Sequence, residues 1–303
     1  MCSATKGLED VSTSFWDIND NAPYWADVFQ EDPWTYTPSY SLLEGFSVEL
    51  IQADLLHVWH LGCGRDLLAS VLVWMVSHRV LFQGRSVEAR LDDATCRLKA
   101  WARLQKLPLK LHKLSKSKLS WAKDKYPELR SSGYDTFVVL RWLKQEVSAC
   151  ESEMPPAVVA ALHSADHVLS LMARGGHFLS EEEMDNKVAF GHLFLRSYMD
   201  LATSNLQGGQ RLYRVRPKLH LLTHILKARP KSGRNPDSWS TWMDEDALRR
   251  MMRTLRLTDS RTAQKRMLQR WLLGLPSTWR KKRAETTTAH VLLPPGSIRL
   301  QLV

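Results

Sequence analysis

Several patterns that identify common classes of protein are missing from this sequence of 303 residues. Its four cysteines form no C-x-x-C pair, so neither a zinc ribbon nor a disulfide framework is indicated, and a reducing compartment fits best. No G-x-G-x-x-G or G-x-x-x-x-G-K-[S/T] loop occurs, which disfavours dinucleotide enzymes and nucleotide-hydrolysing motors. The nucleophile motif G-x-S-x-G is absent as well, so esterase-like hydrolases find no support.

The chain also lacks a long apolar run. The longest one, residues 67–76, contains Ser70 and ends at Ser77, which is short of the roughly 18 to 20 residues that span a bilayer. The N-terminus has no basic region followed by an apolar segment, the pattern of a secretory signal. We therefore expect a buried helix at this run, no membrane partner, and an intracellular protein, with the nucleus as one candidate location.

Positive charge is concentrated late in the chain. Residues 1–62 hold ten acidic side chains and one lysine, whereas residues 210–285 hold twenty Lys or Arg and six acidic side chains. A basic block of this kind favours a polyanionic partner, with nucleic acid first and anionic membrane second. The alternative is a set of solvated helix faces whose charges cluster by chance. A lysine-rich stretch at residues 106–125 could contact phosphate or form a solvated loop-helix, and the solvated loop-helix is favoured.

Apolar periodicity predicts a mainly α protein with a minor β component and a bundle-like body. A content of 44% apolar residues is ample for a packed core. Alternation at residues 46–51 predicts one short strand, which would end just before Asp54. Helices are predicted at residues 65–81, 86–106, 136–148, 156–174, 180–206, 219–227, 244–257 and 260–273.

Three regions follow from this pattern. Residues 1–48 are aromatic and acidic, contain helix-breaking prolines and have no regular period, so we expect their rings to pack on the helical body. Residues 49–275 form that body. Residues 276–303 form a basic tail that contains proline and glycine, and this tail is expected to be mobile or to form an edge strand.

An acid and two histidines lie close together in the run Asp54-Leu-Leu-His57-Val-Trp-His60. Because Asp54 and His57 are three residues apart, a helix or a tight turn places them on one face, where they can share a proton or a metal ion. This makes the run the best candidate for chemistry in the chain. A thiol–histidine pair with the nearby Cys63 is disfavoured.

A second histidine pair lies in the run Arg216-Pro-Lys-Leu-His220-Leu-Leu-Thr-His224. The spacing of four residues places both imidazoles on one helix face, which is compatible with two ligands of a zinc site. The run has no H-E-x-x-H glutamate and no obvious third ligand, so a structural pair is favoured.

The order of these motifs resembles the distal half of a DDE/D transposase of the CACTA/Plavaka kind. Such proteins carry a D-x2-H motif, a helical insertion, a Pro-Lys-x-His-x-Leu-x-His block and a late catalytic acid. Here the corresponding runs lie at residues 54–57, 217–224 and 242–246, and the resemblance covers about residues 42–275. It implies a partial RNase H-like domain with a helical insertion, which cuts and joins DNA with the help of a divalent metal.

By position, the resemblance implies that Asp54, His57 and Glu245 are catalytic, with Asp244 or Asp246 as substitutes for Glu245. Asp54 and Glu245 would then hold Mg²⁺ or Mn²⁺, the ions that carboxylates suit. The first catalytic aspartate and the opening strands of an RNase H-like sheet are not found, which indicates a fragment or a decayed copy. DNA binding is therefore favoured over cleavage; an active enzyme would be a metal-dependent DNA strand transferase or nuclease.

The last predicted helices supply the candidate surface for DNA. Arginines share one stripe of residues 244–257, beside an apolar stripe, and a basic run follows at residues 280–283. Acids at the start of this helix and arginines later also suit the helix dipole, which is the alternative explanation. The rival function is a non-enzymatic helical scaffold or interaction protein that binds an acidic partner or RNA. The predicted nucleic-acid-binding residues are Arg249, Arg253, Arg256, Arg280, Lys281, Lys282 and Arg283.

Overall fold

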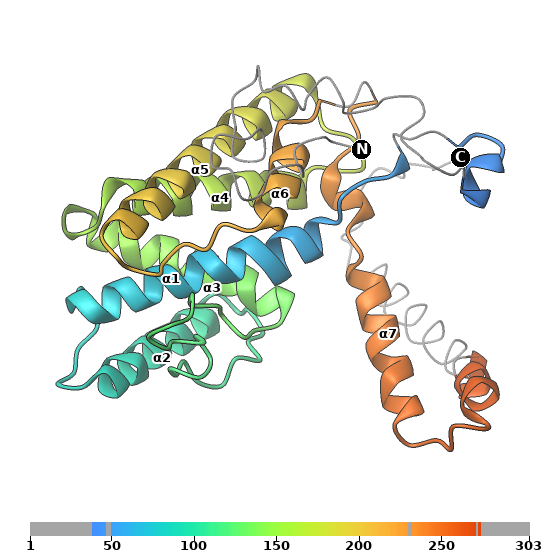
Figure 1. Ribbon diagram of the computed structural model, residues 1–303, viewed down its shortest axis with the longest axis horizontal. Helices are drawn as coiled ribbons and strands as arrows, with labels where there is room; N and C mark the ends of the chain where they lie inside the picture. The colour runs from blue at the N-terminus through green and yellow to red at the C-terminus, as the bar shows by residue number, and fades with distance from the viewer. Residues whose placement is uncertain (1–37, 47–49, 230–231, 271, 274–303) are drawn as a thin grey trace, which may run out of the picture. The chain divides into compact units, whose positions relative to one another are not determined.

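The computed structural model describes residues 38–46, 50–229, 232–270 and 272–273 (Figure 1). This part of the chain is mainly helical, which confirms the predicted class. It divides between Ser240 and Thr241 into two compact units. We call residues up to Ser240 the body and those from Thr241 the second unit, and each is described by itself.

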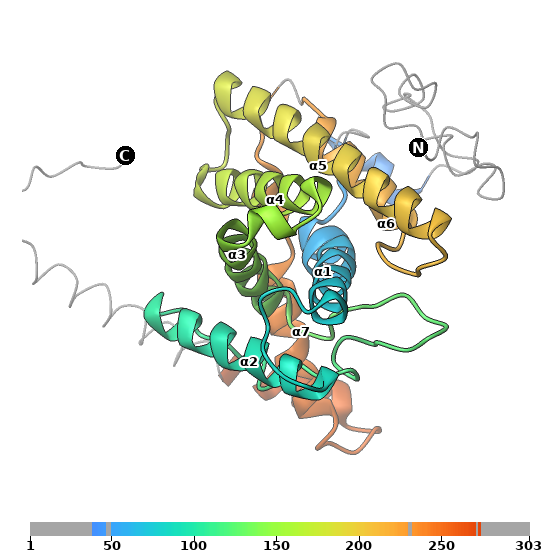
Figure 2. The same ribbon diagram turned by 90° about the vertical axis from the view of Figure 1, so that its left-hand side faces the viewer.

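The body consists of helices joined by short loops and one long one. Within it, α4 and α5 pack side by side, and α1 lies against η5, α2 and α3 (Figures 1 and 2). The elements are η3 (Ser39–Leu42), η5 (Leu56–Cys63), α1 (Gly64–His78), α2 (Val87–Leu104), α3 (Gly133–Ala149), η6 (Glu151–Glu153), α4 (Pro156–Arg174), α5 (Glu181–Gln207), α6 (Pro217–Lys227) and η7 (Pro236–Trp239).

Local sequence explains where these helices begin. Ser86 and Ser132 accept hydrogen bonds from backbone N–H groups three residues later, so each caps the helix that follows. Ser180 and Glu183 form the capping box that their spacing predicts. Pro156 occupies the first turn of α4, where its missing N–H costs nothing. The predicted helix bounds are therefore confirmed to within a few residues.

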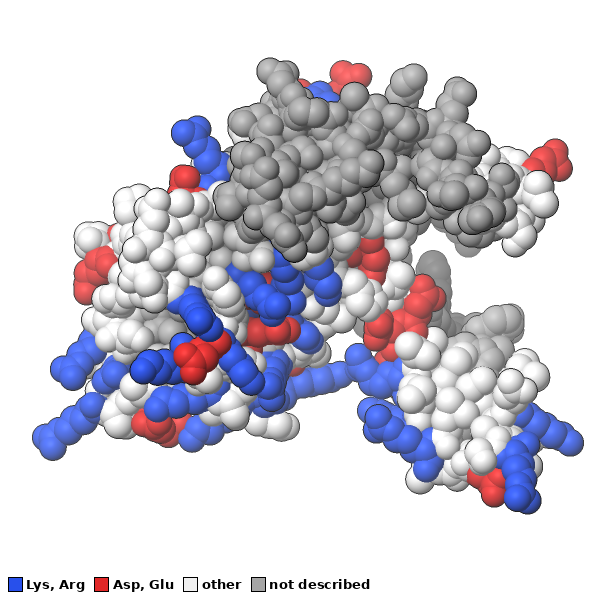
Figure 3. Space-filling view, in the orientation of Figure 1, with Lys and Arg blue, Asp and Glu red and all other residues white. Residues whose placement is uncertain are grey.

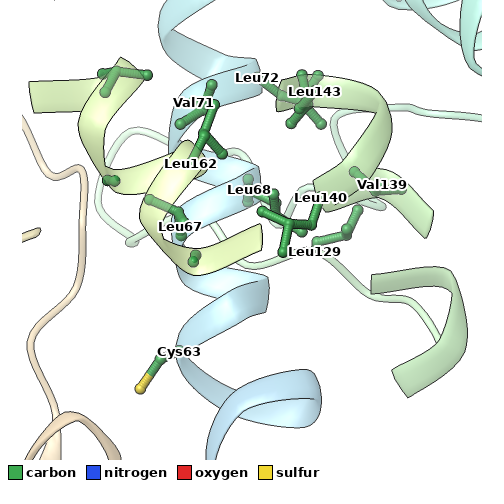
Figure 4. Packing of buried hydrophobic residues seen from close by; sticks show 14 of the residues in the cluster. Cys63, Leu67, Leu68, Val71, Leu72, Leu129, Val139, Leu140, Leu143 and Leu162 are labelled. Atoms are coloured by element: carbon green, nitrogen blue, oxygen red, sulfur yellow. The ribbon is translucent and has the colours of Figure 1, made fainter. Parts of the chain in front are cut away.

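The core is built around α1, the apolar run that the sequence predicts to be buried. Its side chains Leu67, Leu68 and Leu72 are fully buried and lie against Leu140 of α3 and Leu162 of α4 (Figure 4). Each such leucine contributes about 1.5 to 3 kcal/mol by leaving water. Because α1 has core contacts along most of its length, the segment that precedes it, η5, is held in a fixed place.

Among the described residues, one helix, α4, has the length and the apolar composition needed to cross a membrane. Half of its apolar window is buried within the protein, where α3 and α5 pack against it. A helix at the centre of a bundle passes the same test of length and composition. The pattern is therefore explained by the packing of α4 in the body.

The lysine-rich stretch at residues 106–125 contains turns and no helix. Leu111, Leu114 and Leu119 are buried beneath it, while Lys113 pairs with Asp92 and Lys116 with an acidic side chain of α2. The predicted loop-helix is therefore a loop without a helix, and two of its lysines pair with α2.

The predicted minor β component has no counterpart in the described residues, where the only β contact is an isolated bridge between Phe178 and Arg234. At the predicted strand 46–51, Leu50 lies in a helical turn and residues 47–49 lie outside the described part. No described residues form an RNase H-like sheet. The prediction for the aromatic segment falls mainly on residues 1–37, and that for the basic tail on residues 276–303, outside the described residues.

The second unit contains α7 (Trp242–Leu255) and further helical residues at 263–270 and 272–273. The helices predicted at residues 244–257 and 260–273 correspond to these. The sequence had assigned this region to a body that extends to residue 275, whereas the structure divides the chain after Ser240.

Candidate functional site

Two predicted motifs that are far apart in the sequence meet in the body. The first motif leads into η5, a π-helical run that is followed directly by α1. The second motif forms α6, which packs on η5. Lys218 of α6 donates hydrogen bonds to the carbonyl oxygens of His57 at 2.8 Å and Leu61 at 3.4 Å. Because π-helical turns occur frequently at functional sites, this junction is the candidate site of the body.

Gly62 allows α6 to approach η5 this closely. A Cβ atom at residue 62 would lie 2.8 Å from the Cδ of Lys218 and 2.9 Å from the carbonyl oxygen of His57. Both distances are shorter than a normal van der Waals contact of a Cβ atom. A larger residue at position 62 would therefore displace the side chain of Lys218. The glycine therefore belongs to the geometry of the site.

Asp54 caps the start of the helical run. Its carboxylate accepts hydrogen bonds from the backbone N–H groups of Leu56, at 3.1 Å, and His57, at 3.3 Å, and contacts the Nδ1 of His57. The side chain of Asp54 is 19% exposed and that of His57 is 46% exposed, so the pair lies at the surface. A carboxylate on Nδ1 fixes the orientation of an imidazole, which suits proton transfer as well as a helix cap.

His60 lies on the buried side of the same run. Burial lowers the pKa of His60 to about 3, and the nearby charge of Asp54 raises it only in part. The imidazole is therefore neutral at physiological pH and cannot supply a positive charge to a phosphate. Its ring centre lies 6.3 Å from that of Phe137 on α3, so His60 acts as a core side chain.

His220 and His224 form a pair on α6, with perpendicular rings and their Nε2 atoms 2.9 Å apart. Burial, and next His220, lower the pKa of His224 to about 4, so one neutral imidazole donates to the other. In the described part of the chain, no three His, Cys, Asp or Glu side chains form a group that could hold a metal ion. The structural interpretation of the pair remains favoured.

Cys63, at the end of η5, differs from a reactive thiol in its pKa. Burial, and then the charge of Asp66, raise the pKa of Cys63 to about 12. The thiolate is the nucleophilic form, and it is not populated at neutral pH. Burial therefore disfavours a thiol–histidine pair at this site.

A buried ion pair that the sequence analysis did not predict links the start of α6 to α1, next to the site. Arg216, next to the start of α6, contacts both carboxylate oxygens of Asp66 on α1 through two guanidinium nitrogens. Asp66 is fully buried; burial raises its pKa to about 6, while Arg216 lowers it. One signal was present in the sequence, because Asp66 directly precedes the apolar run 67–76, and a carboxylate buried with that run needs a partner. The pair joins α1 to α6 and so positions Lys218.

The remaining predicted residues lie in the second unit or beyond it. Glu245 is on α7, so its predicted pairing with Asp54 would join the two units and stays a prediction. Arg249, Arg253 and Arg256 are exposed on α7 or directly after it. Figure 3 shows Lys and Arg side chains at the surface of the second unit. The four predicted basic residues at 280–283 lie outside the described residues.

The three arginines differ from most cations of the body in their surroundings. Among the described residues, none of the three forms an ion pair or a side-chain hydrogen bond. The ion pair on this helix joins Arg250 to Asp246. The alternative in which local acids neutralise Arg249, Arg253 and Arg256 is therefore not realised in the described part of the chain.

Comparison with protein families, with curated proteins and with solved structures finds no match for this chain.

Proposed function

We propose that the chain is a transposase-derived protein that binds DNA through the arginine face of its second unit, and that binding rather than cleavage is its surviving property. The observation that carries the proposal is the exposure of Arg249, Arg253 and Arg256 without acidic partners among the described residues. Cations in this state attract a polyanion at little cost, because no internal ion pair has to break first.

The charge of the second unit supports the same partner. Residues 241–303 hold thirteen Lys or Arg and five Asp or Glu, which is +8 of the chain's net +10. The three arginines are spaced four and three residues apart, which places them on one stripe about 10 Å long. Contacts of this kind bind phosphates and carry no sequence information, so we expect binding without marked sequence preference.

Two observations favour binding over cleavage. Two-metal phosphoryl transfer needs several carboxylates that converge on one place. The carboxylate of Asp54 already accepts two backbone N–H groups and contacts His57, and the described residues contain no group of three potential metal ligands. Catalysis by Mg²⁺ or Mn²⁺ would need Asp54 and Glu245 to share an ion.

The binding test compares the full chain with a variant in which Arg249, Arg253 and Arg256 are replaced by alanine. Affinity for duplex DNA is measured at several salt concentrations, on two unrelated sequences. The variant should bind both sequences more weakly, and the slope of log affinity against log salt should become shallower by about 0.9 for each lost phosphate contact. An unchanged slope would remove this face from consideration.

A matched control removes three cations that already have partners. Arg97, Lys113 and Lys116 pair with acids of the body, so replacing them by glutamine removes the same formal charge. Because these cations are already paired with acids of the body, the control should keep most of its affinity for DNA. Its slope of log affinity against log salt should also stay nearly the same. Equal losses in both variants would mean that net charge alone drives binding.

Cleavage is tested on supercoiled DNA with magnesium or manganese. We expect no nicking by the purified chain. Nicking that occurs in the wild type and disappears in both Asp54→Ala and Glu245→Ala would overturn this part of the proposal and make the chain an enzyme. Nicking that persists in both variants would come from a contaminant.

The rival function also has an observation in its favour. Seven large apolar side chains of the second unit are exposed among its described residues: Met243, Leu248, Met252, Leu257, Leu268, Leu272 and Leu273. A helical interaction protein that binds an acidic partner or RNA would use this apolar surface together with the arginines. Salt separates the two functions, because an apolar contact depends little on salt whereas phosphate contacts lose affinity steeply.

A further inference from the structure

The body contains a polar pocket that none of the motifs discussed above includes. It lies between α2 and α3 and has a cavity volume of about 230 Å³. One wall comes from one face of α3, whose lining residues are spaced three and four apart, and the other comes from Trp101 of α2 and from Gln105, which directly follows α2. The lining residues are Trp101, Gln105, Arg141, Lys144, Gln145 and Ser148.

Arg141 supplies the charge of this pocket. Its guanidinium lies over the ring of Phe137, 5.5 Å from the ring centre, which is a cation–π contact. Its Nε lies 3.9 Å from a carboxylate oxygen of Asp166, too far for a hydrogen bond. Among the described residues no acceptor takes a hydrogen bond from this guanidinium. Arg141 is therefore held in place with its N–H donors available to a bound anion.

The second cation of the pocket, Lys144, is already paired with an acid. Lys144 donates to Asp166 at 2.6 Å, and Asp166 is buried, so this lysine neutralises the buried carboxylate. On α4, His163 contacts the hydroxyl of Ser148 at 2.9 Å. The pocket is lined by two cations, Arg141 and Lys144, and both share one carboxylate, that of Asp166, so this cluster keeps one excess positive charge.

Trp101 supplies a flat wall. Its indole N–H donates to the side-chain oxygen of Gln145 at 2.7 Å, which fixes the plane of the ring, and the ring also packs against the core. An indole held in this way offers a face on which a planar ring can stack. The amide groups of Gln105 and Gln145 stand beside it and can hydrogen-bond the edge of such a ring.

We propose that this pocket binds one nucleotide unit, with its base stacked on Trp101 and its phosphate paired with Arg141. The volume is below the roughly 300 to 1,000 Å³ of pockets that take drug-sized ligands, so a dinucleotide cofactor does not fit. The unit has two possible sources, a free nucleotide or an unpaired nucleotide within a strand. The strand source rests on the proposed DNA binding and would give the body a contact of its own with nucleic acid.

The test measures binding of adenosine and cytidine 5′-monophosphates, inorganic phosphate and a short single-stranded oligonucleotide to the full chain by calorimetry. Arg141→Gln removes the phosphate contact, and Trp101→Leu removes the stacking face but keeps an apolar side chain against the core. Each should weaken nucleotide binding about tenfold or more. Arg196→Gln, which changes an exposed arginine of α5, is the matched control and should leave binding unchanged.

Comparison of the ligands shows whether the bound nucleotide is free or part of a strand. Equal or tighter binding of the oligonucleotide, with the same sensitivity to Arg141→Gln, indicates a strand, and binding of the monophosphates alone indicates a free nucleotide. The α7 triple variant should retain monophosphate binding even if DNA binding fails, so the two proposals fail separately. Trp101→Phe, which keeps an aromatic face, should restore most of the affinity lost in Trp101→Leu.

Three outcomes would overturn the inference. The first is that neither the monophosphates nor the oligonucleotide bind at millimolar concentration. The second is that binding is unchanged in the Arg141 and Trp101 variants, while thermal unfolding shows that both are folded. The third is that inorganic phosphate binds as tightly as the nucleotides, because the indole would then contribute nothing.

Discussion

The body and the second unit differ in their balance of charge and in how many of their cations are paired. Residues 1–240 hold 29 Lys or Arg and 27 Asp or Glu, which nearly balance, and several of the described cations pair with acids of neighbouring helices. In the second unit positive charge exceeds negative charge by eight, and the arginines on or beside α7 are exposed. Several charges of the body therefore join its helices, whereas Arg249, Arg253 and Arg256 of the second unit have no ion pair among the described residues.

The largest effect is expected from the buried ion pair of the body. Asp66→Ala leaves the guanidinium of Arg216 without its carboxylate, and loss of one member of a buried pair costs about 3 to 5 kcal/mol of unfolding free energy. Urea unfolding followed by circular dichroism measures this change. Asp92→Ala, which breaks the exposed pair with Lys113, is the control and should cost less than about 1 kcal/mol. Equal midpoints for the two variants would contradict the structural role of the Asp66–Arg216 pair.

The close contact between η5 and α6 should give the next largest effect. Gly62→Ala places a Cβ atom against Lys218 and the His57 carbonyl, and overpacking of this kind costs about 1 to 3 kcal/mol. The measurement is again the urea midpoint. Gly176→Ala is the matched control, because a Cβ atom there meets nothing within 4 Å. If Gly62→Ala is as stable as the control, the lysine contact is not needed for the junction of the two motifs.

The buried imidazole of His60 should make the body sensitive to acid. Its folded pKa, about 3, is below the unfolded value of 6.5, so below pH 6.5 the unfolded chain binds more protons and stability falls. The loss from this group is up to about 1.4 kcal/mol per pH unit. Asp66 acts in the opposite direction, because its raised folded pKa favours the folded state as pH falls from about 6 to 3.8.

Comparison with His60→Gln isolates the contribution of this histidine. Unfolding free energies are measured at pH 7.5, 6.5 and 5.5 for the wild type and the variant, since Asp66 contributes equally to both. The variant should lose less stability than the wild type between pH 6.5 and 5.5. The same slope in both proteins would mean that His60 is not held neutral in the folded body.

The smallest effect is expected from the α7 variant that removes Arg249, Arg253 and Arg256. These side chains make no pairs with described residues, so unfolding of the body should change by less than about 0.5 kcal/mol. The same preparation that loses DNA affinity should therefore keep its urea midpoint. A large loss of stability would show that the arginines support the fold, which would contradict the proposed difference between the two units.

Most of the helical architecture could be predicted because its signals are local. The serines before α2, α3 and α5 and the proline at the start of α4 mark helix starts within one turn of sequence. The strand predicted near residues 46–51 shows the limit of this method. Leu50 lies in a helical turn, and an alternation over only six residues fits either structure.

The candidate site was predicted in part. The motif at Asp54 and His57 was identified as one pair, and the structure brings these side chains together. The contributions of Lys218 and Gly62 were missed, because no local pattern relates two segments more than 150 residues apart. The charge of Asp66 inside an apolar helix was the one available signal that a buried partner existed.

The sequence by itself determined the helical class, the ends of most helices and the concentration of positive charge after residue 240, because capping, periodicity and charge are properties of neighbouring residues. Only the tertiary structure decided that Lys218 seats on η5, that Asp66 and Arg216 pair, and that Arg141 and Trp101 line one pocket. These arrangements arise when apolar faces pack and bring distant segments together. A buried charge, a close glycine or a pocket is defined by what surrounds it, and those surroundings exist only in the folded chain.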